Sequence, residues 1–123
     1  MVSVHLDARD WGAKQKQIKQ LVQHLGAKDD SVEQLVMGDY NVCPQHIYDD
    51  GSQWSFLTKQ MEGIGLEDLW SGDQCEPTEG QGTLDHIFWR PLGRTVISKR
   101  VVRVTEPHSG LSVSDHYGIE AIV

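Results

Sequence analysis

The sequence has little positive charge for its size, because 11 Lys and Arg residues stand against 18 Asp and Glu residues, for a formal net charge of −7. Broad, sequence-independent binding to nucleic acid depends on clustered cations, so this balance argues against it. It does not exclude a phosphodiester substrate, because a bound divalent cation can supply positive charge locally. The composition therefore disfavours a general nucleic-acid-coating protein and leaves phosphoester chemistry open.

The chain also lacks long apolar runs, low-complexity stretches, internal repeats and linkers. No run approaches the roughly 18 apolar residues typical of a membrane-spanning helix. No signal peptide precedes the first predicted strand, so we expect a soluble protein whose compartment the sequence does not indicate. Cys43 and Cys75 have no CxxC spacing. Two free buried thiols and one disulfide are therefore both open for this pair.

What the sequence does contain is an alternation of apolar strand and helix patterns. Residues 9–26 and 52–63 have apolar side chains at helical spacing, and Gly26 and Gly63 are natural ends for these helices. Strands are predicted within residues 2–8, 33–41, 82–90, 94–104 and 114–123. This order predicts a single α/β (α+β) domain over residues 1–123, with both helices on one face of a mixed sheet.

That layout leaves one face of the sheet without cover. Several predicted strands, such as residues 85–90, are apolar enough to need packing on both sides. A lone chain of this size would expose the second face or a sheet edge. We therefore expect either a missing segment or a second copy to cover it, and an isolated chain that is marginally stable, dimeric or prone to aggregate.

Polar side chains gather at the predicted strand ends, where α/β proteins commonly build sites. Taken singly, each short motif is typical of a turn or a helix cap, because Asp, Asn and Ser bond readily to nearby backbone. Their order and spacing together favour a site. The candidates are His5, Asp39, Asn41, Asp85, Asp115 and His116.

Four motifs in this order, "VHLDA", "VMGDYN", "GTLDHIF" and "SDHYGIEAIV", resemble the second half of the endonuclease/exonuclease/phosphatase superfamily. That superfamily includes DNase I, exonuclease III-like apurinic endonucleases, sphingomyelinases and inositol-polyphosphate 5-phosphatases. The resemblance covers residues 2–123. It implies one layer of a four-layered DNase I-like α/β sandwich and metal-dependent hydrolysis of a phosphodiester.

The resemblance also implies a role for each candidate residue. His5 helps to protonate the leaving oxygen or to hold the phosphate. Asp39 and Asn41 orient the attacking water or the metal and hydrogen-bond the phosphoryl oxygens. Asp85 holds His116, the general base, in one tautomer. The implied ligands of Mg²⁺, or of Mn²⁺ or Ca²⁺, are Asp115 and Asp39.

The residue types suit this reaction without the resemblance. A histidine titrates near neutral pH and can act as acid or base. A carboxylate on its other ring nitrogen fixes the tautomer and the orientation. Carboxylate and amide oxygens suit hard divalent cations, and an Asn amide can donate to a developing negative oxygen.

The sequence departs from the family in one respect. Complete members carry an upstream half with a glutamate that is the principal metal ligand, and no glutamate here takes its place. Three explanations stay open: a fragment of a longer enzyme, a half-enzyme that assembles with another chain or a second copy, and a relic without activity. We therefore expect weak metal binding by this chain alone.

The substrate is open as well. The "VHLDA" and "DHIF" motifs and the acidic charge lean towards a sphingomyelinase-like or general phosphodiesterase with a lipid substrate. The "SDHYGIE" motif fits a DNase I-like endonuclease equally well. A non-catalytic binding or assembly module is the alternative from another class. Among the other histidines, His24 is expected to be solvated and His86 to be structural, because His86 points to the opposite side of its strand from Asp85.

Overall fold

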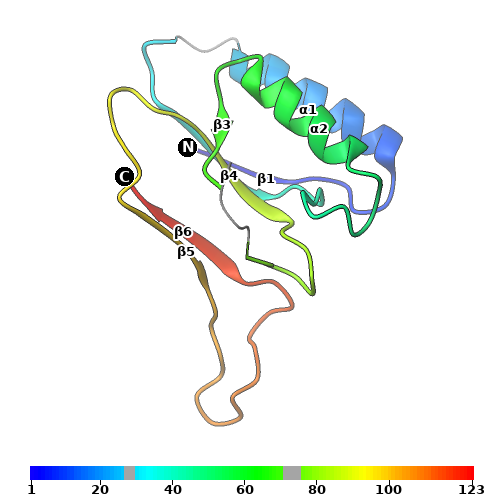
Figure 1. Cartoon of the computed structure of the whole chain (residues 1–123), viewed down its shortest axis with the longest axis vertical. Helices are drawn as coiled ribbons and strands as arrows, with labels where there is room; N and C mark the ends of the chain where they lie inside the picture. Colours follow the sequence, from blue (N-terminus) through cyan, green and yellow to red (C-terminus); the bar gives the residue numbers. More distant parts are fainter. Residues whose placement is uncertain (27–29, 71–75) are drawn as a thin grey trace.

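The computed structural model describes residues 1–26, 30–70 and 76–123, and shows a four-stranded sheet, two helices and a separate two-stranded sheet. The elements in chain order are β1 (Val2–His5), α1 (Trp11–Gly26), β2 (Gln34–Asp39), α2 (Ser52–Glu62), β3 (Glu67–Asp68), β4 (Asp85–Arg90), β5 (Ser98–Val102) and β6 (Gly118–Ile122). Figure 1 shows both helices side by side on one face of the main sheet. The predicted fold class is confirmed.

The main sheet has the strand order β1-β2-β4-β3. β1 and β2 are parallel, and α1 forms the crossover that a parallel pair requires. β4 runs antiparallel to both β2 and β3. This mixed arrangement places the carboxyl ends of β1 and β2 beside the amino end of β4, where the polar candidate residues lie.

The core lies between the helices and the sheet. Val36 and Phe88 are paired across β2 and β4, and both are fully buried against the helices. The buried helical side chains keep the predicted spacing, with Ile18 and Leu25 on α1 and Leu57 and Met61 on α2. The sequence periodicity therefore located the buried face of each helix correctly.

The last two strands differ from the expected single sheet. β5 and β6 pair antiparallel with each other alone within the described residues, and β6 contacts β4. Lys99 of β5 donates to the Leu69 carbonyl at 2.6 Å, and its ammonium lies 5.9 Å from the centre of the Trp70 ring. In Figure 1 this hairpin continues into a long arm that projects from the body. The hairpin thus gives partial cover to a side of the sheet that the sequence left open.

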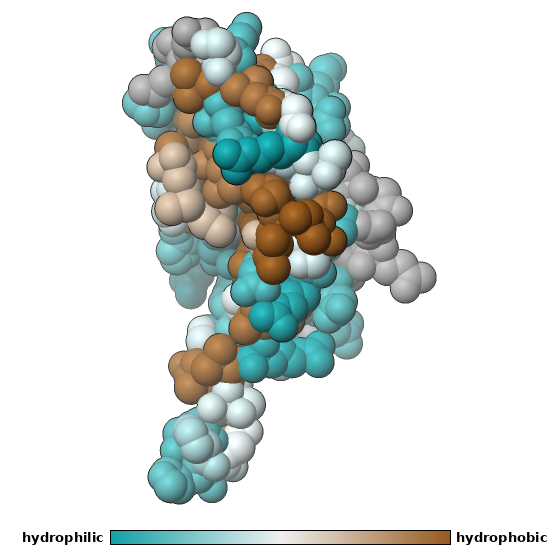
Figure 2. Space-filling model, turned by 90° about the vertical axis from the view of Figure 1, so that its left-hand side faces the viewer, coloured by the Kyte–Doolittle hydropathy of each residue, from teal (hydrophilic) through white to brown (hydrophobic). Residues whose placement is uncertain are grey.

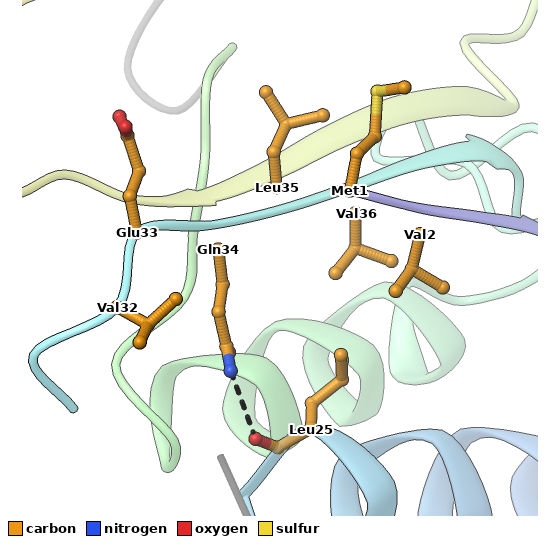
Figure 3. Close-up of a pocket in the computed structure, with 8 residues that line it drawn as sticks. All are labelled: Met1, Val2, Leu25, Val32, Glu33, Gln34, Leu35 and Val36. Atoms are coloured by element: carbon orange, nitrogen blue, oxygen red, sulfur yellow. Dashed lines mark hydrogen bonds between the residues drawn. The ribbon is translucent and has the colours of Figure 1, made fainter. Parts of the chain in front are cut away.

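Apolar surface nevertheless remains exposed. Figure 2 shows apolar side chains gathered on one side of the molecule, and Met1, Ile97 and Ile122 are 93%, 73% and 49% exposed. At the start of β2 an open apolar hollow of about 380 Å³ is walled by Val2, Leu25, Val32, Leu35 and Val36, among others (Figure 3). Gln34 reaches into the same region and donates to the Leu25 carbonyl. Neither helix is long and apolar enough to cross a bilayer, as far as the described residues go.

Candidate active site

Three candidate side chains lie in one row across the sheet. His5 of β1 pairs with Asp39 of β2, and Asp39 pairs with Asp85 of β4. Residues paired across neighbouring strands point to the same side, and the side chains alternate along each strand. Because Val36 and Phe88 face the helices, this row faces away from them. The register therefore brings together residues that are 34 and 46 positions apart in the sequence.

Gly38 permits the close approach of β1 and β2 beside this row. Its φ is 145°, and a Cβ at this position would lie 2.0 Å from the Val4 carbonyl oxygen. Any other residue would force the two strands apart. The glycine of the "GDYN" motif therefore has a structural reason, because it keeps His5 next to Asp39.

The turn after Asp39 is held by three hydrogen bonds. Asn41 has a left-handed backbone, with φ of 49°, which Asn tolerates better than most residues. Its N–H donates to Asp39 Oδ1 at 2.8 Å, and its Nδ2 donates to the Leu6 carbonyl at 2.9 Å. Lys14 of α1 donates to the Asn41 carbonyl at 2.6 Å. Nδ2 carries two hydrogens, so one remains for another acceptor.

His116 approaches the row from the loop before β6. Its Nδ1 lies 2.8 Å from Asp85 Oδ2, and its Nε2 lies 3.8 Å from Asp39 Oδ2. Nε2 of His5 lies 3.5 Å from the same Asp39 oxygen, although the His5 side chain is 76% exposed. Asp85 thus holds one ring nitrogen of His116, and the other ring nitrogen faces Asp39.

Buried Thr78 connects the segments that carry Asp85 and His116. Its Oγ1 accepts from the backbone N–H of Asp85 at 3.1 Å, and its carbonyl accepts from the N–H of Tyr117 at 2.6 Å. Glu79 forms a β-bridge with His116. Polar residues in a loop carry no apolar periodicity, so no pattern in the sequence singles out Thr78.

Burial and neighbouring charges shift the acid–base properties of the site. Burial raises the pKa of Asp39, and the nearby charge of Asp85 raises it further. The hydrogen bond from the Asn41 N–H acts in the opposite direction but does not cancel this rise. Burial alone would lower the pKa of His116, but the hydrogen bond and charge of Asp85, with Asp39 and Asp115, outweigh it and raise the pKa. The two carboxylates thus favour a positive charge beside them.

This arrangement fits a divalent cation. Asp39, Asp85 and His116 each offer a ligand atom, and these atoms lie within 4.8 Å of one another. Two neighbouring carboxylates, one with its pKa raised partly by the other, form a site that a hard cation would neutralise. Asp115, the other predicted metal ligand, is exposed and is not one of the three residues in this cluster, although its charge acts on His116.

A cavity of about 470 Å³ opens beside the cluster. Its lining includes Arg9, Lys14, Asn41, Tyr48 and His116. One carboxylate, Glu79, also lines this space and accepts from the Tyr48 hydroxyl at 3.1 Å. The two cations Arg9 and Lys14 outnumber it, so the polar lining next to His116 suits an anionic ester.

Lys14 is the residue that the sequence reasoning missed. The lysines of an amphipathic helix usually lie on its solvated face, but Lys14 is only 3% exposed. It lies four positions before Ile18 and so continues the buried stripe, which is the signal that could have identified it. Burial lowers the pKa of the Lys14 ammonium, although the negative charges of Asp7, Asp49 and Asp39 act to raise it.

The remaining histidine predictions are confirmed. His24 is exposed, whereas His86 is fully buried, with Nε2 2.9 Å from the Val42 carbonyl oxygen. Burial lowers the pKa of His86 to about 4, so this ring is neutral at ordinary pH. Cys43 is a buried free cysteine, and Cys75 lies outside the described residues.

Comparison with known proteins identifies the family of the chain. The sequence profile of the Endonuclease/Exonuclease/phosphatase family matches residues 2–116. The chain belongs to this family. A search of curated proteins finds no match.

Solved structures of the same fold include a humanized TDP2 of D. rerio with 14 mutations, at 19% identity and a TM-score of 0.68. D. rerio TDP2 complexed with a single-strand DNA product has 17% identity and a TM-score of 0.61. A mannosyl-6-phosphatase of Bacteroides thetaiotaomicron has 16% identity and a TM-score of 0.56. At these identities the likeness establishes the endonuclease/exonuclease/phosphatase fold.

The match covers 96%, 96% and 98% of this chain but only 52%, 53% and 50% of those three structures. The chain therefore spans about half the length of the solved family structures that it matches.

Proposed function

We propose that this chain carries the acid–base half of a metal-dependent phosphodiester hydrolase. The strongest support is that Asp39, Asp85 and His116 each place a ligand atom within 4.8 Å of the others. The chain also belongs to a family of hydrolases. Tautomer control of a histidine by a carboxylate, next to a second carboxylate, is the arrangement that activation of a water molecule requires.

In this mechanism His116 is the general base. Asp85 accepts from Nδ1–H, so Nε2 carries the lone pair that takes a proton from the attacking water. Asp39 orients that water, because its Oδ2 lies on the Nε2 side of the ring, 3.8 Å from Nε2. In-line attack on phosphorus then expels the leaving oxygen on the opposite side.

Two further side chains act on the phosphate. Asn41 donates its second Nδ2 hydrogen to a phosphoryl oxygen as negative charge develops there. His5 protonates the leaving oxygen or holds the phosphate, and its high exposure suits a group that meets substrate at the rim. Mg²⁺, Mn²⁺ or Ca²⁺, when bound by Asp39 with Asp115 or Asp85, would neutralise charge on the phosphoryl oxygens.

We also propose that residues 1–123 are a partial domain, the C-terminal half of the family fold. The coverage of about half of each solved relative supports this, as do exposed apolar side chains such as Met1, Ile97 and Ile122 on the surface. A further segment or partner chain would cover that surface, and a second copy of this chain is the alternative. The further segment or partner chain, unlike a second copy, would also supply the glutamate that the resemblance implies and residues 1–123 lack.

The test is hydrolysis of bis-p-nitrophenyl phosphate with Mg²⁺ and then with excess EDTA. It uses the full-length protein, meaning residues 1–123 together with the segment or partner chain that completes the fold. We expect turnover with Mg²⁺ and none with EDTA. Absence of turnover above buffer in Mg²⁺, Mn²⁺ and Ca²⁺ would instead favour a non-catalytic binding or assembly module that keeps the fold.

The substrate class is tested next. The acidic charge supports a sphingomyelinase-like or general phosphodiesterase with a lipid substrate, whereas one similar structure is described in complex with a single-strand DNA product. Sphingomyelin vesicles and supercoiled plasmid DNA, assayed side by side with Mg²⁺, separate the two. Preferential cleavage of the plasmid would make the chain part of a DNase I-like endonuclease.

A further inference from the structure

Lys14 is a charged residue in an unfavourable place. Its side chain is buried near the start of α1, where the helix dipole disfavours a cation. Its ammonium donates to two uncharged oxygens, the Asn41 carbonyl at 2.6 Å and Gln53 Oε1 at 3.0 Å. The charges of Asp7, Asp49 and Asp39 and the Trp11 ring, 6.0 Å from the ammonium, favour the charged form. Burial outweighs the three carboxylates, because the pKa of Lys14 is lowered, so neither packing nor helix formation accounts for a lysine here.

The contacts of Lys14 join three segments at the site. Lys14 comes from α1, Gln53 from the first turn of α2, and Asn41 from the turn that follows β2. The Asn41 backbone is in the left-handed region, so this turn depends on its hydrogen bonds for its conformation. The bond from Lys14 is the shortest of the three that hold Asn41.

We propose that Lys14 is a positioning residue of the hydrolytic site, which fixes the Asn41 peptide so that the Asn41 amide and the Asp39 carboxylate face the phosphate. This inference rests on the proposed function for the chemistry it serves. It adds a residue of α1, outside the strand ends, to the site. Lys14 contributes to the wall of the cavity beside His116, but it is only 3% exposed and its ammonium already has two acceptors. Its action therefore passes through Asn41 rather than through direct contact with substrate.

A double-mutant cycle on the full-length protein tests this. Lys14→Met removes the charge and the donor with little change in volume, and Asn41→Ala removes the amide that Lys14 is proposed to position. We expect Lys14→Met alone to lower kcat at least about tenfold with KM within about threefold, since small misplacements of catalytic groups have effects of this size. In the Asn41→Ala background the same change should lower kcat less than about twofold.

The matched control is Lys19→Met, which removes an exposed cation from the same helix and should leave kcat within about twofold. A stability control is Ile18→Val, which weakens the core next to Lys14 and should leave kcat unchanged at a temperature where the protein is folded. If Lys14→Met does not fold, Lys14→Gln repeats the cycle with a shorter, neutral side chain. Independent, multiplicative effects of the two mutations, or a rise in KM that persists without the Asn41 amide, would overturn the proposal.

A second readout separates this proposal from the proposed function. The side-chain amide signal of Asn41 in a ¹H–¹⁵N spectrum can be assigned by its loss in Asn41→Ala. We expect Lys14→Met to shift this signal and Lys19→Met to leave it in place. If the wild type hydrolyses nothing, the proposed function fails, and the shift still decides whether Lys14 positions Asn41. An unchanged signal in Lys14→Met contradicts the positioning role.

Discussion

Replacing Asn41 by Ala and by Gly should separate its backbone role from its chemical role. The left-handed backbone, with φ of 49°, costs an L-residue such as Ala about 1–2 kcal/mol relative to Gly. Gly avoids this cost, but it also makes the unfolded chain more flexible, which lowers the stability of the Gly variant by about 0.4–1 kcal/mol. Both variants lose the bond from Nδ2 to the Leu6 carbonyl, worth about 0.5–1.5 kcal/mol.

We therefore expect Asn41→Ala to lower the free energy of unfolding by about 1.5–3.5 kcal/mol, and Asn41→Gly to be the more stable variant by about 0.8 kcal/mol. Both should lose about 10²–10³ in kcat, because both lack the amide donor. Urea unfolding and bis-p-nitrophenyl phosphate hydrolysis, each on the full-length protein, measure the two effects. Equal stability of the variants would refute the backbone reasoning, and full activity in either would refute the role of the amide.

Three further outcomes follow from the charges of the site and the core. The rate of hydrolysis should fall as the pH drops through the raised pKa of His116, because the base must be neutral. Asp85→Asn removes the charge that raises this pKa, so it should move the fall in rate to lower pH. An unmoved pH profile contradicts the pairing of Asp85 with His116. Buried Asp68 has its pKa raised to about 7 from an ordinary 3.8. Its contribution to stability is therefore complete below the ordinary value and lost as the pH rises through about 7. Urea unfolding from pH 4.5 to pH 8 should show this loss in the wild type and not in Asp68→Asn. Metal removal should abolish turnover, Mg²⁺ should restore it, and the affinity for Mg²⁺ measured by calorimetry should be weak for residues 1–123 alone; tight one-to-one binding contradicts this last expectation.

Much of the fold was predictable because apolar spacing is local information. Ile18 and Leu25 on α1, and Leu57 and Met61 on α2, lie at the expected buried positions. β3 was missed because Glu67 and Asp68 make a strand of two acidic residues with no alternating pattern. The separate pairing of β5 with β6 was also missed, since the choice of strand partner depends on contacts that residue spacing does not encode.

Some residues of the candidate site could likewise be predicted from the sequence, and others could not. His5, Asp39 and Asp85 could be chosen because they stand at strand ends, and the register then explains why they meet. Thr78 and Lys14 could not be chosen by chemistry, because a loop threonine and a helical lysine are ordinary surface residues in most sequences. Their importance comes from burial, which the spacing to Ile18 indicates for Lys14 and which only the packed chain reveals for Thr78.

The most direct test of the central claim is the rate of bis-p-nitrophenyl phosphate hydrolysis by His116→Ala, compared with the wild type and with His24→Ala. His24 lies exposed on α1, and its replacement removes the same side chain away from the site. Loss of a general base lowers rates by about 10²–10⁴, so His116→Ala should fall in that range while His24→Ala stays within twofold. A His116→Ala protein that hydrolyses the ester at the wild-type rate would contradict the account.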